Sequence, residues 1–180
     1  MGRKKYDDEV PGEGDRDIAL QALERGYAAL CLEQRGMGER RTDKVWNKKD
    51  NGEPRCLATA LDAILLGRSL IGERCWDISR AIDLALTFPE IDGDKILCTG
   101  NSGGGTATYY AACFDERIKV ALPSCAVCTF KDSITAMPHC SCNYVPGIAQ
   151  YMDMGDMATL IAPRKLVVIS GKDDDCFPIK

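Results

Sequence analysis

A serine stands inside a glycine-rich turn, in the segment Gly100-Asn101-Ser102-Gly103-Gly104. The pattern G-x-S-x-G is typical of a nucleophile elbow, a sharp turn between a strand and a helix that pushes the serine hydroxyl clear of the sheet. The next residue can then offer its backbone N–H to an oxyanion formed beside that hydroxyl. Ser102 is therefore the predicted nucleophile, Gly103 the predicted oxyanion donor, and Asn101 a candidate for contact with the substrate.

The sequence on either side of this turn fits an elbow. Residues 95–99 form a short, mostly apolar run that predicts a buried strand, and residues 105–112 are rich in small residues that can begin a helix. The alternative is an ordinary glycine-rich turn that holds a phosphate. The Gly-Lys-Ser/Thr ending of a P-loop does not follow, which argues against that alternative.

A serine nucleophile needs a base, and the base needs an acid to orient it. Three aspartates, Asp173, Asp174 and Asp175, follow the apolar run at residues 166–170. On parallel sheets the active-site residues gather beyond the carboxyl ends of the strands, which is the place these aspartates would occupy. We expect a catalytic acid among the three, and a solvated acidic turn is the alternative interpretation.

The base is less easily found, because His139 is the one histidine of the chain and it precedes the acid. In hydrolases with a nucleophile elbow the order is serine, acid, histidine. His139 is therefore predicted to line the substrate pocket. We expect the catalytic histidine to lie beyond Lys180, and the 180 residues to be a fragment that is also cut at its start.

Ten cysteines are a high count for a chain without a visible secretion signal. Free cysteines pack as small hydrophobic residues, and most of these are expected to do so. A denser group, formed by Cys125, Cys128, His139, Cys140 and Cys142, could bind zinc. The second cysteine pair is spaced C-x-C, which departs from the usual zinc knuckle, so no metal and no cofactor are predicted.

Composition narrows the class of protein. Hydrophobic residues make up 45% and charged residues 28% of the 180, as in ordinary globular domains, and the net charge of −4 gives no reason to expect a nucleic-acid partner. No apolar run approaches the ~20 residues that span a bilayer, and the start has no signal-peptide core. We expect a cytoplasmic protein with a small-molecule substrate, no membrane partner and an oligomeric state that the sequence leaves open.

Strand-like and helix-like segments alternate along the chain, which predicts a single α/β domain over residues 1–180 with a mostly parallel sheet. A long irregular connection, lid-like in length and composition, is expected at about 124–156. The predicted helices span 15–25, 57–71 with a break near Gly67, and 76–88; the predicted strands span 27–32, 95–99, 118–122 and 166–170.

The chain resembles the acetyl xylan esterase and dienelactone hydrolase-like branch of the α/β-hydrolase superfamily. Residues 34–38 (QRGMG), 100–104 (GNSGG) and 171–178 (GKDDDCFP) carry the resemblance, together with Trp76-Asp77. It implies a three-layer α/β-hydrolase sandwich, incomplete at both termini. It also matches Ser102 to the family nucleophile, Gly103 to the oxyanion residue and Asp174 to the acid, whereas the family histidine has no counterpart.

The leading hypothesis is thus a serine ester hydrolase that acts on small acyl or carbohydrate (acetyl) esters through an acyl-enzyme. Its activity in this chain is expected to be impaired, because the catalytic histidine is absent. Two alternatives remain: a fragment of a prolyl oligopeptidase-type serine peptidase, and a non-enzymatic zinc-binding module built on the cysteine and histidine group.

Overall fold

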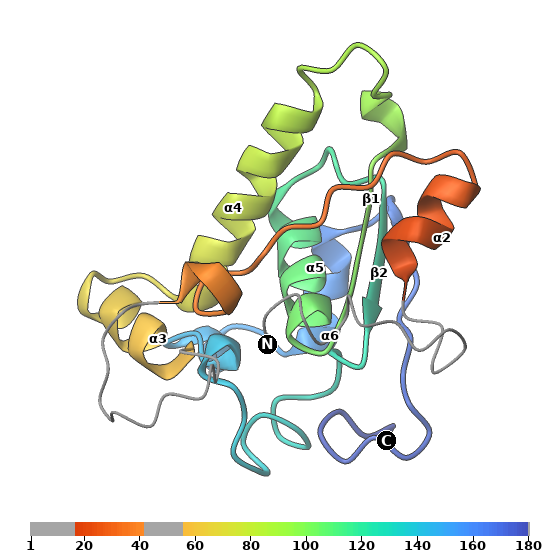
Figure 1. Ribbon diagram of the computed structural model, residues 1–180. Coiled ribbons are helices and arrows are strands. Elements are labelled where there is room, and N and C mark those ends of the chain that lie inside the picture. The colour runs from red at the N-terminus through yellow and green to blue at the C-terminus, as the bar shows by residue number, and fades with distance from the viewer. Residues whose placement is uncertain (1–16, 42–55, 180) are drawn as a thin grey trace.

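The computed structural model describes residues 17–41 and 56–179 (Figure 1). These residues alternate between helices and strands, as the sequence predicts for an α/β domain. The elements are α2 (Ile18–Glu24), η1 (Gly38–Arg40), α3 (Cys56–Leu65), α4 (Leu70–Ala85), η2 (Gly93–Lys95), β1 (Leu97–Asn101), α5 (Gly103–Phe114), β2 (Val120–Ser124), η3 (Ser141–Asn143), η4 (Ile148–Gln150), α6 (Met154–Met157), η5 (Ala158–Leu160) and β3 (Lys165–Leu166), where η marks a 3-10 turn.

The three strands form a parallel sheet in the order β1-β2-β3. Asn101 lies opposite Ser124, so β1 and β2 end side by side. A further bridge joins Ser124 to Ile169, three residues after β3. The carboxyl ends of all three strand segments therefore meet at one edge of the sheet, which is where a parallel sheet places its functional loops.

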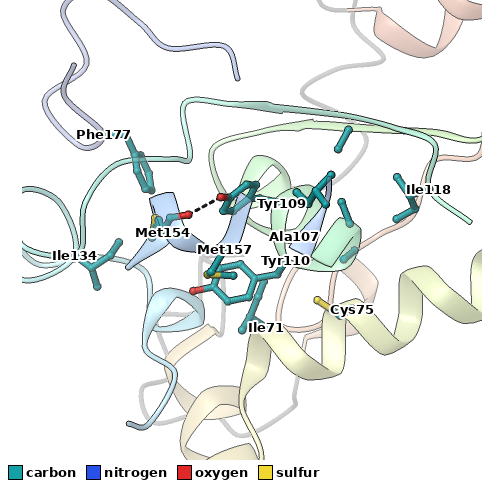
Figure 2. Packing of buried hydrophobic residues seen from close by; sticks show 14 of the residues in the cluster. Ile71, Cys75, Ala107, Tyr109, Tyr110, Ile118, Ile134, Met154, Met157 and Phe177 are labelled. Carbon is teal, nitrogen blue, oxygen red and sulfur yellow. Dashed lines mark hydrogen bonds between the residues drawn. The ribbon is translucent and has the colours of Figure 1, made fainter. Parts of the chain in front are cut away.

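Helix α5 is the centre of the core. Its residues from Gly105 to Ala112 are all buried, as expected of a helix that is covered on every side. It packs against β1 and β2 on one side and against α4 on another, and Figure 1 shows α4 and α5 running together beside the strands. Near its middle, the Tyr109 hydroxyl donates a hydrogen bond to the Met154 carbonyl oxygen at 2.5 Å (Figure 2), which fixes α6 to the same core.

The helix predicted over 57–71 is two helices in the structure. Gly67 has a φ of +70°, a left-handed conformation that glycine adopts without strain, and it follows the end of α3. Ser69 then caps α4, and its hydroxyl accepts a hydrogen bond from the Gly72 N–H at 3.1 Å. The predicted break is confirmed, but Leu70 and Ile71 belong to the second helix.

The strand predicted at Tyr27–Leu32 is wrong, because the described residues give that segment no ladder partner. The Tyr27 N–H instead donates to the carbonyl oxygen of Ala22 and closes the end of α2. Tyr27 and Leu30 are each 58% exposed, so apolar composition here does not reflect burial. The helix predicted over 15–25 is observed as α2, and its first two positions lie outside the described residues.

β1 and β2 each begin two residues later than predicted, whereas β3 begins at Lys165 and ends at Leu166, short of the predicted 166–170. Asp92 caps the 3-10 turn η2, with its carboxylate accepting from the Asp94 N–H at 2.9 Å, and this turn occupies the first position of the predicted strand. β1 therefore starts at Leu97 and continues to Asn101, immediately before Ser102.

Within the described residues, no helix is long and apolar enough to cross a membrane.

The predicted irregular connection lies between β2 and α6. Between residues 125 and 153 the structure has no α-helix and contains the 3-10 turns η3 and η4. Phe130, Ile134 and Cys142 nevertheless bury their side chains. The connection is thus anchored to the domain at several points along its length.

Candidate active site

Ser102 occupies a strained elbow between β1 and α5. Its φ of +51° and ψ of −117° lie in a region that non-glycine residues rarely adopt. The Ser102 N–H donates to the carbonyl oxygen of Ser124, and the Ser102 carbonyl oxygen accepts from the Thr106 N–H, both at 2.8 Å. Strain that the surroundings hold in place is typical of functional residues, and the Ser102 side chain is exposed where a substrate can reach it.

Two glycines let the strand and helix come close enough to form this elbow. A Cβ at Gly100 would lie 2.5 Å from the Gly104 carbonyl carbon, and one at Gly105 would lie 2.5 Å from the Ser124 carbonyl oxygen. Both contacts are with backbone atoms, so no side-chain movement could relieve them. Packing therefore requires glycine at Gly100 of the G-x-S-x-G pattern and at Gly105 just beyond it, whereas a Cβ at Gly104 would meet only the Gln34 Nε2 at 3.6 Å.

Gly103 is the first residue of α5, and its N–H is one of those at a helix start that have no acceptor inside the helix. The N-terminal end of the helix also carries partial positive charge. A Cβ built on Gly103 would lie 3.7 Å from the Met37 Cε, an ordinary contact distance. From the helix start, the Gly103 N–H can donate to the oxyanion of a carbonyl group that Ser102 attacks.

The loop at residues 34–38 lies against the elbow. Gln34 Nε2 donates to the Gly103 carbonyl oxygen at 3.4 Å, and the Met37 Cε lies 3.7 Å from the position that a Cβ on Gly103 would take. The other amide atom, Gln34 Oε1, is buried and has no partner among the described residues. Sequence reasoning used this loop only for the family resemblance, since 69 residues separate Gln34 from Gly103.

Charged side chains clamp this loop to α4. Arg35 grips both carboxylate oxygens of Asp77, at 2.7 and 2.8 Å, and also pairs with Glu73 at 2.7 Å. The hydrogen bond to Asp77 raises the pKa of Arg35. Burial works to raise the pKa of Asp77, but the hydrogen bonds from Arg35 and Arg40 outweigh it and hold that pKa below its ordinary value. Both groups are therefore charged across the neutral range.

Asp174 differs from the two aspartates beside it. It is half-buried, and its Oδ1 accepts from the N–H groups of Cys176 and Phe177 at 2.9 and 3.0 Å, whereas Asp173 and Asp175 are exposed. The hydrogen bond from Phe177 is the main reason that the pKa of Asp174 is lowered. The carboxylate is thus charged and held by its own turn, leaving Oδ2 free of these two contacts.

The elbow and the acid turn meet at the end of β2. Ser124 accepts from the Ser102 N–H, and the next residue, Cys125, interacts with the Asp174 carboxylate. The Cys125 thiol also lies 3.7 Å from a Cβ built on Gly171, at the start of the acid turn. Ser102 and Asp174 therefore contact two consecutive residues, Ser124 and Cys125, at the end of β2.

His139 lies on the acid turn rather than at the nucleophile. Its Nε2 is 3.2 Å from both the Cys176 carbonyl oxygen and the Ser133 hydroxyl oxygen, and its ring meets Phe177 edge to face at 5.1 Å between centroids. In this arrangement His139 supports the acid turn. Asn101, the other candidate for substrate contact, accepts from the Ser124 hydroxyl at 3.0 Å.

The cysteine and histidine group proposed for zinc is divided between different places. Cys125 faces the acid turn, Cys128 donates to the Pro178 carbonyl oxygen, and Cys142 lies 3.3 Å from the Cys140 thiol. Within residues 17–41 and 56–179, no group of three or more histidine, cysteine or acidic side chains is arranged to hold a metal ion. The described residues therefore offer no support for a zinc module.

A family model and a curated relative each match most of this chain. The family model "Acetyl xylan esterase (AXE1)" matches residues 11–144, which include the elbow but not the acid turn. The inferred hydrolase YtaP of Bacillus subtilis (strain 168) is 27% identical over 156 residues, covering 85% of this chain and 48% of its own length. The chain thus spans about half the length of that relative.

Solved structures show the same fold at low identity. A protein from Bacteroides fragilis NCTC 9343, inferred to be an acetyl xylan esterase, superposes with a TM-score of 0.72 at 18% identity, over 87% of this chain and 43% of its own. The glucuronoyl esterase from Solibacter usitatus gives a TM-score of 0.51 at 22% identity, over 62% of this chain and 33% of its own. The predicted α/β-hydrolase fold is confirmed, as a partial one with a small parallel sheet.

Proposed function

Because the chain belongs to the acetyl xylan esterase (AXE1) family, we propose that it carries the nucleophile, oxyanion donor and acid of a serine esterase that acts on small acyl esters and acetylated carbohydrates. One observation carries the proposal. Ser102 is exposed at a φ of +51°, directly before the free N-terminal N–H of α5 at Gly103. This arrangement presents a hydroxyl and an oxyanion donor to the same carbonyl group.

The proposed reaction follows from that geometry. The Ser102 Oγ attacks the ester carbonyl carbon, and the resulting oxyanion accepts a hydrogen bond from the Gly103 N–H. Collapse of this intermediate breaks the ester C–O bond, releases the alcohol and leaves the acyl group on Ser102. Attack by water then frees the carboxylic acid and restores the serine.

Both proton transfers need a base that Asp174 could orient. The chain has one histidine, and the contacts of His139 are with Ser133, Cys176 and Phe177. We therefore expect these 180 residues to acylate and deacylate slowly, because no imidazole contacts Ser102. The acetyl group should remain on Ser102 long enough to be detected.

Acyl transfer from p-nitrophenyl acetate tests this proposal directly. The folded chain is incubated with the ester, digested with trypsin and examined by mass spectrometry for acetyl-Ser102. Imidazole added at about 0.1 M should accelerate both acetylation and turnover, because a free base can replace a missing one. The Ser102→Ala variant is the control, and the signal specific to Ser102 must disappear in it.

Two outcomes would overturn the proposal. One is acetylation of lysines with none on Ser102, even in the presence of imidazole. The other is turnover that persists unchanged in Ser102→Ala. With acetylated xylan oligosaccharides as a second substrate, release of acetate that depends on Ser102 would extend the proposal to carbohydrate esters.

A further inference from the structure

A cluster of three thiols surrounds a buried arginine beside the elbow. Cys56 and Cys142 are buried, Cys140 is exposed, and Arg74 is only 1% exposed. The Cys140 and Cys142 sulfur atoms lie 3.3 Å apart, and Arg74 Nη2 lies 3.2 Å from the Cys56 sulfur. Cys56 belongs to α3, Arg74 to α4 and Cys142 to the 3-10 turn η3, and Cys140 directly precedes that turn.

Arg74 lacks the carboxylate that usually accompanies a buried guanidinium. It donates twice to the Arg35 carbonyl oxygen, at 2.7 and 3.2 Å, and no acidic side chain of the described residues pairs with it. Its Nη1 is buried without a partner in the part of the chain that the structure describes. A guanidinium cannot lose its proton at any pH that the protein survives, so this buried charge favours a thiolate nearby.

The pKa values of the thiols near Arg74 are shifted in different directions. The hydrogen bond with Cys140 and the positive charge of Arg74 together lower the pKa of the Cys142 thiol. The hydrogen bond with Cys140 and burial raise the pKa of the Cys56 thiol. The hydrogen bond with Cys142 raises the pKa of the Cys140 thiol. Cys142 is therefore the thiol of the cluster most readily converted to a thiolate, and Cys140 is the one that solvent can reach.

We propose that Cys140 and Cys142 form a site of reversible oxidation that takes low-molecular-weight disulfides and closes to an intramolecular disulfide. The two residues are two positions apart, so their Cα atoms are within about 7 Å and their backbone can meet the span of a disulfide. Closure requires the sulfur atoms to approach from 3.3 Å to the ~2.05 Å of an S–S bond.

The reaction proceeds by two exchanges. Cys140 passes its proton to the Cys142 thiolate 3.3 Å away and attacks one sulfur of the small disulfide RSSR; an S–S bond forms between Cys140 and that sulfur, and RS⁻ leaves and takes up the proton now on Cys142. The Cys142 thiolate then attacks the Cys140 sulfur of this mixed disulfide, and the second RS⁻ leaves. In total two cysteine thiols are oxidised, RSSR is reduced to two RSH, and the thiol protons go to the departing thiolates.

A disulfide between Cys140 and Cys142 can be detected in the wild-type protein, without any mutation. Trypsin cleavage after Lys131 and Arg164 yields a peptide, residues 132–164, that contains Cys140 and Cys142 and no other cysteine. The folded full chain is equilibrated with oxidised glutathione, its free thiols are blocked in acid, and the digest is examined without reduction. The expected product is this peptide with two hydrogens fewer, returning to the dithiol after treatment with dithiothreitol.

Cys142→Ser and Cys31→Ser sharpen the experiment. Without Cys142 the second exchange cannot occur, so a glutathione adduct should persist on Cys140. Cys31 is an exposed cysteine on another segment, and its replacement should leave the Cys140–Cys142 disulfide unchanged. The wild-type digest decides the matter even if Cys142→Ser does not fold.

Three results would overturn the proposal. In the first, peptide 132–164 stays a dithiol while Cys31 accepts glutathione. In the second, it is joined to the peptide that contains Cys56. In the third, the Cys142→Ser chain carries no adduct on Cys140. None of these measurements depends on esterase activity, so their outcome is independent of whether the proposed function is correct.

Discussion

The backbone N–H of Ser102 donates a hydrogen bond to the carbonyl oxygen of Ser124, 2.8 Å away. This bond joins the elbow to the end of β2. The next residue, Cys125, has a φ of +49° and donates its N–H to Ile169 at 2.7 Å, so the chain after β2 is held toward the acid turn. The two non-glycine residues with positive φ in the described part of the chain, Ser102 and Cys125, thus lie at one edge of the sheet, and Cys125 also contacts the Asp174 carboxylate.

The strain at Ser102 predicts a difference between two substitutions that both remove the hydroxyl. Ser102→Ala keeps a Cβ at a φ of +51°, whereas Ser102→Gly removes it and tolerates the same backbone. We expect the glycine variant to be more stable than the alanine variant by about 1 kcal/mol. Urea unfolding measures both, and equal stabilities would show that the elbow is not strained in solution.

The close approach of β2 and α5 predicts that Gly105→Ala is strongly destabilising. The new Cβ would lie 2.5 Å from the Ser124 carbonyl oxygen and 2.7 Å from the Ala126 Cβ. Relieving this overlap must separate the strand from the helix and disturb the bond to Ser102, at a cost of about 2–3 kcal/mol. The free energy of unfolding in urea measures the effect.

Gly155→Ala is the matched control for Gly105. Gly155 also lies in a helix, α6, and a Cβ there meets nothing within 4 Å. Alanine should leave the stability unchanged or raise it by up to about 1 kcal/mol, since it restricts the unfolded chain. A similar loss in both glycine variants would mean that helix context, rather than the close contact, sets the cost at Gly105.

The elbow could be predicted from sequence because its information is local. Glycines on both sides of Ser102, a preceding strand and a following run of small residues all lie within about twenty positions, so the turn follows from short-range geometry. The acid turn was placed by the same reasoning. The structure adds that only Asp174 of the three aspartates is held by backbone N–H groups.

What the sequence did not reveal depends on contacts between distant segments. Gln34 and Met37 reach Gly103 from nearly 70 residues away, and Cys56 meets the Cys140 thiol across a similar gap. The strand predicted from the apolar run at Tyr27–Leu32 does not form. A strand needs a neighbouring strand to pair with, and amino-acid composition does not report whether one is present.

An ion-pair network at the end of α5 predicts a pH dependence of stability. Arg117 Nη2 pairs with Asp115 at 2.6 Å, and the Ser79 hydroxyl donates to the same carboxylate at 2.8 Å. The hydrogen bond from Arg117 is the main reason that the pKa of Asp115 falls to about 2. Because the folded state lowers this pKa, the stabilisation is fully present above about pH 4 and is lost as the pH falls toward 2.

Asp115→Asn removes that dependence. We expect the free energy of unfolding of the wild type to exceed that of this variant by about 2 kcal/mol at pH 6. This difference should shrink between pH 4 and 2. Urea unfolding at several pH values measures it. Asp173→Asn, which changes an exposed carboxylate, should show little difference at any pH. A gap for Asp115→Asn that is constant down to pH 2 would contradict the ion-pair explanation.

The clamp between Arg35 and Asp77 predicts that the loop at residues 34–38 controls acylation of Ser102. Lysine cannot reproduce the two-pronged contact of the arginine, so Arg35→Lys should release the loop while keeping the charge. Gln34 and Met37 would then no longer be held against Gly103. We expect acetylation of Ser102 by p-nitrophenyl acetate to slow about fivefold, which corresponds to about 1 kcal/mol in the barrier.

Arg80→Lys is the control for this prediction. Arg80 lies on α4, as Asp77 does, but it pairs with Asp83 three residues along and is half exposed. Its replacement should leave the acetylation rate unchanged. Asp77→Asn also removes the contact with Arg40 at 2.8 Å, so it should slow acetylation at least as much as Arg35→Lys. The double variant should be little slower than Asp77→Asn alone, because Arg35→Lys breaks a contact that Asp77→Asn already removes. Additive losses would show that Arg35 and Asp77 act on Ser102 by separate routes and not through the loop.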